Sequence, residues 1–401
     1  MLSFFDAESL VNTIVGLVGS LAGSCCALTT SQTLTIGRRK YRVLRQLGEG
    51  GFSVVSLIED VERGTQYALK KMICHQGTDA FAKAQREMDA YGRFRHRNII
   101  PMVDALVDET QHGLRTVYMV FPVYLKGNLF DLAMHNEETG TRLGEDQVIH
   151  IFRGVCAAVR FLHNYRQRGG GEAAEYESEE RQGDGGGDTQ RFLDTPAIAD
   201  ERETEPAPGP TASGYTKVQG ADPDSSGSTA SQTKHGASGI TAYAHRDIKL
   251  ANVMLADDGR TPILMDFGSV GAARYSARTR SDALRIQDDA AENCTMAYRA
   301  PELFDVQTGA EFDERTDIWS LGCLLFALAY NFTPFEDPAA GPGASIALAA
   351  INGKYTYPKG DVYSDRLRQL VDFMLEPDPK QRPFIDQVIA LTNSLYPQQH
   401  S

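Results

Sequence analysis

The spacing of apolar side chains changes along the chain and predicts strands first and helices later. Residues Tyr41–Leu47 are strand-like, and a second strand-like stretch follows soon after them. Residues Phe81–Tyr91 have the spacing of a helix, and the apolar-periodic run Val148–His163 indicates a long buried helix. The chain is therefore expected to combine a β-rich part with a helical part.

One region lacks any such pattern. Residues 166–240 contain 14 acidic and 7 basic side chains and hardly any large apolar group. This composition cannot bury enough surface to offset the entropy of ordering, so a disordered acidic insertion is predicted. Loop-closure entropy grows only logarithmically with length, so such a loop between His163 and His245 is compatible with folding. Its Ser/Thr-rich part, 224–233, is either a phosphorylated regulatory tail or an inert spacer.

Net charge limits the classes of partner. The 401-residue chain has a formal net charge of −13, and the insertion holds a large share of the negative charge. Nucleic-acid phosphates are bound by basic surfaces. A nucleic-acid partner is therefore not expected.

Polar residues with related chemistry gather in two motifs, H-R-D-I-K-L-A-N from His245 and D-F-G from Asp266. Asp247 is a carboxylate suited to accept the proton of a substrate hydroxyl, and Lys249 can offset charge on a transferred phosphoryl group. Asn252 and Asp266 offer the oxygen ligands that Mg²⁺ prefers. These residues form the set that phosphoryl transfer from Mg-ATP requires, so ATP and Mg²⁺ are the expected cofactors.

A glycine-rich segment lies upstream, between the two strand-like stretches. Glycine lets a backbone approach phosphate groups closely, because no side chain stands in the way. The third glycine of the G-x-G-x-x-G pattern is absent, with Ser53 in its place, so a plain hairpin turn remains an alternative. The residues of this candidate phosphate-binding segment are Gly48, Glu49, Gly50, Gly51, Phe52, Ser53 and Val55.

The next strand supplies a candidate lysine. The run Y-A-L-K, which includes Ala68 and ends at Lys70, matches the V-A-I-K strand whose lysine contacts the α- and β-phosphates. Lys71 is adjacent, but successive strand side chains point to opposite faces, and the motif register selects Lys70. Glu87 is the predicted ion-pair partner of Lys70. A solvated helix face carrying Glu87 and Asp89 is the alternative.

Two further segments, Thr295–Glu302 and Thr316–Gly322, complete the ordered motifs of a protein kinase, and the chain resembles that family. The runs 300–307, 313–325 and 344–350 are similar to the Numb-associated kinases. Within that family the chain most resembles the branch of myristoylated and palmitoylated serine/threonine kinases, as a fungal-type homologue. The resemblance spans roughly residues 38–398 apart from the insertion.

The resemblance implies a two-lobed α+β kinase fold. A small β-rich lobe with one helix is expected at about 38–121, and a large helical lobe at about 125–398. ATP would lie between the lobes with its adenine against the linker Phe121, Pro122 and Tyr124. Pro122 has no backbone N–H, so adenine would bond its carbonyl and Tyr124. Phe121 is bulky and would restrict entry to the space behind the adenine.

Structural roles for other residues follow from the same resemblance. Thr295 is expected to bond near Asp247, and Asp317 to brace the backbone around Arg246. Members of the family carry an additional helix after the A-P-E motif, and the interval before Asp317 leaves room for one. The resemblance further pairs Glu302 with Arg382, and makes Arg246 a candidate to receive a phosphate on Ser276, Thr279 or Ser281, although related kinases are active without such a switch.

Lys249 favours serine and threonine substrates, because serine/threonine kinases carry a lysine two residues after the catalytic aspartate. An active serine/threonine kinase with protein substrates is therefore the preferred hypothesis, and we expect a monomer. A pseudokinase or scaffold and a membrane adaptor working through its insertion are the alternatives. The intact Lys70, Asp247, Asn252 and Asp266 argue against the pseudokinase.

Residues 1–37 are predicted to anchor the chain to a membrane. No charged residue occurs from Leu10 to Ile36. Cys25 and Cys26 adjoin an apolar stretch and suit S-palmitoylation, and two acyl chains anchor more durably than one. Leu2 stands where N-myristoylation requires glycine, so that lipid is not expected. A transmembrane span and two unmodified cytosolic thiols are the alternatives.

A lipid anchor predicts attachment to the cytoplasmic face of an endomembrane. The resemblance implies the Golgi or the vacuole as the location and vesicle traffic as the process. Cys74, Cys156, Cys294 and Cys323 lack C-x-x-C spacing and are predicted to be reduced thiols. Cys294, which precedes Thr295, is either redox-sensitive or an ordinary buried thiol.

Overall fold

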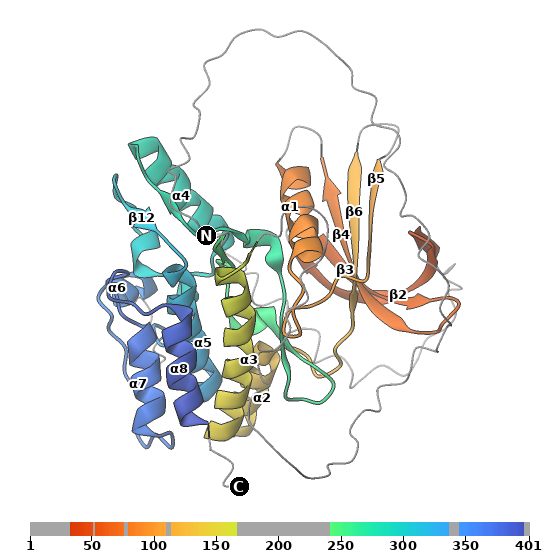
Figure 1. Cartoon of the computed structure of the whole chain (residues 1–401). Coiled ribbons are helices and arrows are strands. Elements are labelled where there is room, and N and C mark those ends of the chain that lie inside the picture. Colours follow the sequence, from red (N-terminus) through yellow and green to blue (C-terminus); the bar gives the residue numbers. More distant parts are fainter. Residues whose placement is uncertain are drawn as a thin grey trace, which may run out of the picture. The chain divides into compact units, whose positions relative to one another are not determined.

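The computed structural model describes residues 33–50, 53–75, 79–109, 114–166, 241–336 and 345–396. In these ranges a β-sheet with one helix forms first, and the larger helical part follows (Figure 1). The predicted two-lobed α+β fold is confirmed. We call residues 33–122 the amino-terminal lobe and the described residues from Val123 onward the carboxy-terminal lobe.

The amino-terminal lobe is built on an antiparallel sheet with strand order β1-β2-β3-β4-β6-β5. Ile36, Tyr41 and Ile58 are fully buried in a core cluster on one face of this sheet. The sheet begins before the predicted boundary at residue 38, because Leu34 and Ile36 alternate with threonines and bring a short edge strand into this core. The strands are β1 (Thr33–Ile36), β2 (Arg39–Gly50), β3 (Ser53–Asp60), β4 (Gln66–Cys74), β5 (Asp104–Glu109) and β6 (Arg115–Pro122).

Helix α1 (Ala80–Arg93) packs against strands β4 and β6. Its buried positions are Ala84, Glu87, Ala90 and Tyr91, which recur at the spacing of one helix face. A charged residue, Glu87, therefore points into the interior together with apolar neighbours, which calls for an ionic partner.

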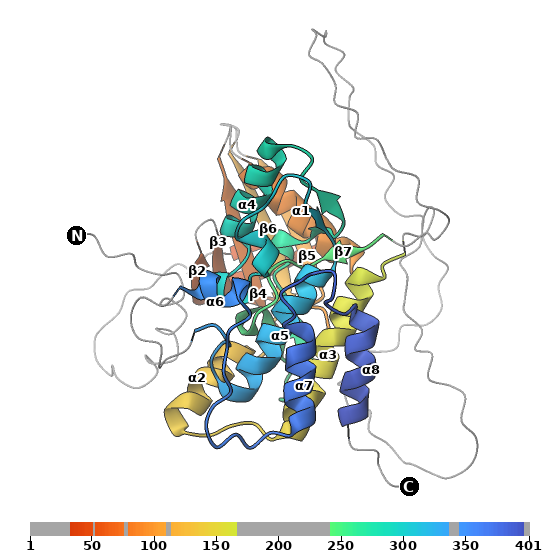
Figure 2. The same ribbon diagram turned by 90° about the vertical axis from the view of Figure 1, so that its left-hand side faces the viewer.

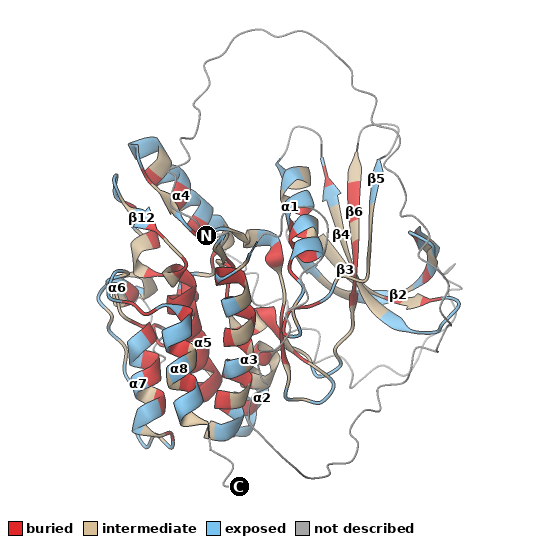
Figure 3. Ribbon diagram, viewed as in Figure 1, coloured by how far each residue is buried: buried red, intermediate tan, exposed pale blue. Residues whose placement is uncertain are grey.

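The carboxy-terminal lobe is organised around α5 (Arg315–Tyr330). Every residue of this helix from Thr316 to Tyr330 is buried, as expected of a helix enclosed by others (Figure 3). Helices α3 and α7 contact α5, and α8 in turn contacts α3 and α7 (Figure 2). The other helices of the lobe are α2 (Leu129–Thr139), α3 (Glu145–His163), α4 (Arg280–Asn293), α6 (Ile346–Ile351), α7 (Asp365–Met374) and α8 (Ile385–Leu395).

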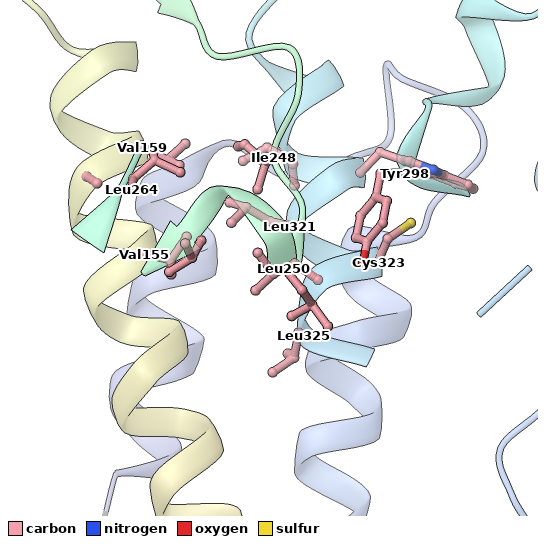
Figure 4. Packing of buried hydrophobic residues seen from close by; sticks show 14 of the residues in the cluster. Val155, Val159, Ile248, Leu250, Leu264, Tyr298, Leu321, Cys323 and Leu325 are labelled. Carbon is pink, nitrogen blue, oxygen red and sulfur yellow. The ribbon is translucent and has the colours of Figure 1, made fainter. Parts of the chain in front are cut away.

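This helical core holds the H-R-D segment in place. Val155 of α3 and Leu321 of α5 converge on Ile248 and Leu250, which follow Asp247 (Figure 4). Leu250 is 2% exposed, so it packs rather than reacts, and burial of such a side chain contributes roughly 1.5–3 kcal/mol. The short elements of this lobe are β7 (Tyr243–Ala244), β8 (Val253–Leu255), β9 (Pro262–Leu264), β10 (Gly271–Ala272), β11 (Tyr275–Ser276), β12 (Glu311–Phe312), η2 (Leu250–Asn252), η3 (Phe267–Ser269), η4 (Met296–Tyr298) and η5 (Pro301–Leu303).

The prediction of an additional helix after the A-P-E motif is wrong. Between η5 and α5 the chain forms β12, which pairs with β11, and no α-helix. An additional helix, α4, instead precedes the motif. It begins with a reciprocal cap in which Thr279 and Asp282 bond each other's backbone N–H groups, which explains why the helix starts there.

None of the helices in the described ranges is both long and apolar enough to cross a bilayer. Cys25 and Cys26, most of the predicted anchor, and nearly all of the predicted insertion lie outside the described residues. Gly51 and Phe52 also lie outside them, and only the backbone of Gly50 is described.

Candidate active site

Asp247 lies at the centre of a hydrogen-bond network. Its Oδ1 accepts bonds from the backbone N–H of Thr295 at 3.1 Å and from the Thr295 hydroxyl at 2.8 Å. Its Oδ2 lies 3.0 Å from Asn252 Nδ2 and 3.1 Å from Lys249 Nζ. Lys249 Nζ also donates to the Thr295 hydroxyl at 2.7 Å. The expected contact of Thr295 with Asp247 is confirmed, and the carboxylate is held in one orientation.

A buried carboxylate fixes the backbone just before Asp247. Asp317 accepts bonds from the backbone N–H of Arg246 at 2.9 Å and of His245 at 2.7 Å, and its Oδ2 lies 3.0 Å from His163 Nε2. Arg246 has a φ of 69°, a conformation that costs a non-glycine residue energy and needs such support. Burial alone would raise the pKa of Asp317, but the bond from His163, the nearby histidine charges and the backbone donors lower it. The expected bracing role is confirmed.

Lys70, Glu87 and Asp266 form a second ionic cluster. Lys70 Nζ lies 2.7 Å from Glu87 Oε1 and 3.6 Å from Asp266 Oδ1. The Glu87 side chain is 2% exposed, so the alternative of a solvated helix face is wrong for this residue. Lys71 lies elsewhere, with its Nζ 5.9 Å from the centre of the Tyr118 ring. The motif register therefore selected the lysine that pairs with Glu87.

The environment sets the protonation of this cluster. The Lys70 ammonium, followed by the charges of His245 and Lys249, lowers the pKa of Asp266. Burial by itself lowers the pKa of Lys70, but the charges of Asp266 and Glu87 outweigh burial and raise it. Burial raises the pKa of Glu87 despite the attraction of Lys70. Lys70 and Asp266 are thus both stabilised in their charged forms.

Tyr91 was not among the predicted site residues, yet it orients the D-F-G segment. Its hydroxyl accepts bonds from the backbone N–H of Asp266 at 3.0 Å and of Phe267 at 3.3 Å. Phe267 is buried with its ring centre 5.1 Å from that of Tyr91. Asp266 has a φ of 63°, a conformation that costs a non-glycine residue energy. The bonds to Tyr91 of α1 stabilise this conformation. Tyr91 stands four residues after Glu87 on the same helix face, which is the signal that identifies it.

The residues present fit a Mg²⁺ site. The Asp266 side chain is 46% exposed and presents carboxylate oxygens. Asn252 donates through Nδ2 to the backbone carbonyl of Asp247 at 2.8 Å and to its carboxylate, which leaves the Asn252 amide oxygen for another partner. A carboxylate and an amide oxygen are the hard ligands that Mg²⁺ prefers.

The predicted nucleotide-contacting residues lie on adjacent strands. Val55 pairs with Lys70 across β3 and β4, and Ala68 is two residues before Lys70, so these three share one face of the sheet. Phe121 pairs with Ala68 and is 7% exposed, which agrees with a bulky residue at the end of β6. Gly48, Glu49 and Ser53 lie in the β2–β3 hairpin, and Pro122 and Tyr124 follow at the linker.

The segment from Thr295 to Glu302 is bonded to Arg382, which lies between α7 and α8. Both Glu302 carboxylate oxygens accept bonds from Arg382, each at 2.9 Å, and the Arg382 side chain is fully buried. This expected pair is confirmed.

Cys294 is buried, and burial together with the nearby Asp247 charge raises its pKa to about 12. An ordinary buried thiol therefore describes Cys294 better than a reactive one.

The guanidinium of Arg246 already has partners. It lies 3.7 Å from Asp289 of α4, donates to the carbonyl of Ala272 at 2.8 Å, and stands 5.0 Å from the centre of the Tyr275 ring. Asp289 was not predicted, because α4 itself was not placed here. A carboxylate from α4 thus occupies the neighbourhood in which a phosphate on Ser276, Thr279 or Ser281 was considered.

Comparisons with known proteins agree with this geometry. A family model described as "Protein kinase domain" matches residues 41–167 and 239–392, and the gap coincides with the predicted insertion. Serine/threonine-protein kinase 16 of Homo sapiens is 31% identical over 375 residues, which cover 94% of this chain and 96% of that protein. Serine/threonine-protein kinase ppk13 of Schizosaccharomyces pombe is 29% identical, with coverage of 90% and 92%. Serine/threonine-protein kinase ENV7 of Saccharomyces cerevisiae is 28% identical, with coverage of 92% and 96%.

Proposed function

Because this chain belongs to the protein kinase family and is a serine/threonine kinase, we propose that it transfers the γ-phosphate of Mg-ATP to proteins with Asp247 as the base. The observation that carries the proposal is the pairing of Lys70 with Glu87 at 2.7 Å, beside Asp266. The paired Lys70 Nζ lies 3.6 Å from Oδ1 of Asp266, the carboxylate of the D-F-G motif. This is the arrangement that a kinase requires for nucleotide positioning.

Asp247 accepts the proton of the substrate hydroxyl as that oxygen forms its bond to phosphorus. The Thr295 N–H and hydroxyl keep its Oδ1 oriented. Lys249, 3.1 Å from Asp247 Oδ2, supplies positive charge beside the transferred group. Serine and threonine specificity rests on this lysine.

Other residues hold the nucleotide. Lys70 contacts the α- and β-phosphates, and Glu87 keeps its ammonium in place. Mg²⁺, when held by Asn252 and Asp266, supplies charge that offsets the phosphate oxygens. The remaining nucleotide contacts are those that the sequence predicts: Gly48, Glu49, Gly50, Gly51, Phe52, Ser53, Val55, Ala68, Phe121, Pro122 and Tyr124. Gly51 and Phe52 among them lie outside the described residues.

The test is transfer of labelled phosphate from Mg-ATP to the chain and to a soluble serine/threonine substrate. Asp247→Asn should remove the base and reduce turnover by about 100-fold or more. Asp146→Asn, an exposed aspartate at the start of α3, is the matched control and should keep full turnover. Equal turnover by wild type and Asp247→Asn would overturn the assignment. Nucleotide binding without transfer in wild type would favour a scaffold.

We propose that activity does not require phosphorylation of the segment between Asp266 and Thr295. The support is that Arg246, the residue that would receive a phosphate, lies 3.7 Å from Asp289. A chain with Ser276, Thr279 and Ser281 all changed to alanine should therefore keep activity within about threefold, the loss expected from the Thr279 helix cap alone. The proposal would be contradicted if the triple variant were inactive and the wild type became active only after phosphorylation.

We also propose that Cys25 and Cys26 are acylated and attach the kinase to the cytoplasmic face of an endomembrane, at the Golgi or the vacuole, with a role in vesicle traffic. The support is the apolar surroundings of the two cysteines and the resemblance to the lipidated branch of the Numb-associated kinases. The Cys25→Ser, Cys26→Ser double variant should leave the membrane fraction, as should wild type after hydroxylamine cleavage of thioesters. Retention of both in that fraction would refute acylation.

A further inference from the structure

Positive charge is concentrated at the beginning of β2. The eight residues from Arg38 to Arg45 include no acidic side chain, in a chain whose formal net charge is −13. The basic members of this run are Arg38, Arg39, Lys40, Arg42 and Arg45.

Strand register places three of these side chains on one face. Lys40 pairs with Thr35 of β1, and Arg42 pairs with Thr33 of β1 and Glu59 of β3. Directly opposed residues share a face, so Lys40 and Arg42 lie opposite to the face on which Tyr41 is buried.

Arg45 returns to the same face as Arg42. Arg45 pairs with Leu57, which stands two residues before Glu59 on β3 and therefore faces the same side. A register shift between Val43 and Arg45 adds one residue to β2, so Arg42 and Arg45 share a face although they are three positions apart. We call Lys40, Arg42 and Arg45 the basic face.

The basic face is open to solvent. All three side chains belong to exposed residues, and Leu44, between two of them, is 39% exposed. Glu59 approaches Arg42 at 3.7 Å and offsets one charge in part, with the Arg42 side chain still 45% exposed. The covering strand β1 contributes only threonines on this side, which are too short to shield the charges.

The position of the basic face in the chain suggests its partner. Cys26 stands seven positions before Thr33, where β1 begins, and a segment of this length spans at most about 25 Å. A lipid on Cys26 would therefore hold β1, and with it the hydrogen-bonded β2, close to a membrane.

We propose that the basic face docks on a membrane surface rich in anionic lipid, with Leu44 at the contact. The inference rests on the proposed attachment through Cys25 and Cys26, and it adds the orientation in which the kinase is held. A lipid anchor combined with basic side chains binds a bilayer more firmly than either one alone. The acidic insertion of the same chain is a competing occupant, and the test separates the two.

The test uses full-length chain produced without acylation and floated with vesicles. One set contains phosphatidylcholine alone, and the other contains about 30 mol% phosphatidylserine. Each basic side chain at an anionic surface contributes about a fivefold gain in partitioning, so the Lys40→Gln, Arg42→Gln, Arg45→Gln variant should bind the anionic vesicles about 100-fold more weakly. Added salt should weaken the wild type and hardly affect the variant.

The matched control removes three exposed charges from the carboxy-terminal lobe, through Lys354→Gln, Lys359→Gln and Arg366→Gln. It has the same net charge as the basic-face variant and should bind like wild type. Equal binding by wild type and the basic-face variant, or no preference of wild type for anionic vesicles, would overturn the proposal.

Two further measurements separate the causes of failure. Binding that appears only after deletion of residues 170–238 would assign the basic face to the insertion and overturn membrane docking by the intact chain. Phosphate transfer to a soluble substrate, measured on the same samples, should be equal in wild type and both variants. Loss of transfer in all samples would count against the proposed catalytic function and not against docking.

Discussion

Two helices, α1 and α4, each present a carboxylate to a basic residue of the active site, and the two contacts differ in kind. Glu87 of α1 is 2% exposed and lies 2.7 Å from Lys70. Asp289 of α4 is 55% exposed and lies 3.7 Å from Arg246. A buried pair has no water to replace a lost partner, whereas water and salt can substitute for an exposed one.

The difference indicates separate roles. Under the proposed mechanism the α1 contact is required in every turnover, because it positions Lys70 for the phosphates of the nucleotide. The α4 contact involves only the guanidinium of Arg246, and the Arg246 backbone is already held by Asp317. A third contact joins the two helices, since Lys83 of α1 lies 3.2 Å from Glu292 of α4.

Removal of the backbone support should have the largest effect. Asp317→Asn leaves the donors of His245 and Arg246 without a buried charge to accept their bonds, so the free energy of unfolding should fall by about 3–5 kcal/mol. Urea denaturation measures the change, with Asp146→Asn as the exposed control. A loss below about 1 kcal/mol would show that Asp317 does not support this segment.

The difference in the free energy of unfolding between wild type and Asp317→Asn should depend on pH. The pKa of Asp317 lies below its usual value of 3.8, because the bond from His163 and the backbone donors outweigh burial. Its contribution to stability is therefore present above about pH 3.8 and is lost as the pH falls through the lower folded-state value. The stability gap between wild type and Asp317→Asn should be constant between about pH 5 and 7 and narrow below about pH 4. A gap that widens on acidification would contradict this sign.

Breaking the α1 contact should mainly affect activity. Glu87→Gln leaves Lys70 with only Asp266 as an ionic partner, and a broken buried pair costs enough to lower kcat/KM for ATP by about 100-fold. Steady-state kinetics with varied Mg-ATP measures the effect. Asp89→Asn, at an exposed position of the same helix, is the control and should stay within about twofold.

Breaking the α4 contact should cost much less. An exposed ion pair contributes about 0.2–1 kcal/mol, so Asp289→Asn should lower kcat/KM by no more than about fivefold. The adjacent Asp288 is also exposed and has no ionic contact with Arg246, so Asp288→Asn is the matched control. A loss as large as that of Glu87→Gln would make Asp289 a required residue and remove the contrast.

The link between the helices should contribute least. Lys83 and Glu292 are 43% and 67% exposed, and the coupling between Lys83→Gln and Glu292→Gln in a double-mutant cycle should stay below about 0.5 kcal/mol. It should disappear at about 0.5 M salt, where exposed charges are screened. A larger coupling that resists salt would mean that α4 controls the position of α1.

The sequence was sufficient where a local rule decides the outcome. Strand alternation together with the motif register separated Lys70 from Lys71, and apolar spacing located the long helix that became α3. Contacts such as Glu302 with Arg382 followed from the motifs of a family rather than from local rules, and the structure contains them.

The sequence was insufficient where tertiary contacts decide. Helical spacing places Tyr91 on the same face as Glu87, but the bond that its hydroxyl accepts from the backbone N–H of Asp266 joins positions 175 residues apart, and no spacing rule predicts that partner. The α4 helix was misplaced, although its cap between Thr279 and Asp282 was visible in the sequence. Asp289 could not be assigned to Arg246 without that helix.

The most direct test of the account measures kcat/KM for Mg-ATP in wild type, Glu87→Gln and Asp289→Asn, purified and assayed together with a serine/threonine substrate. We expect transfer by wild type, a loss of about 100-fold for Glu87→Gln, and a loss of no more than about fivefold for Asp289→Asn. Equal losses in the two variants, or full activity of Glu87→Gln, would contradict it.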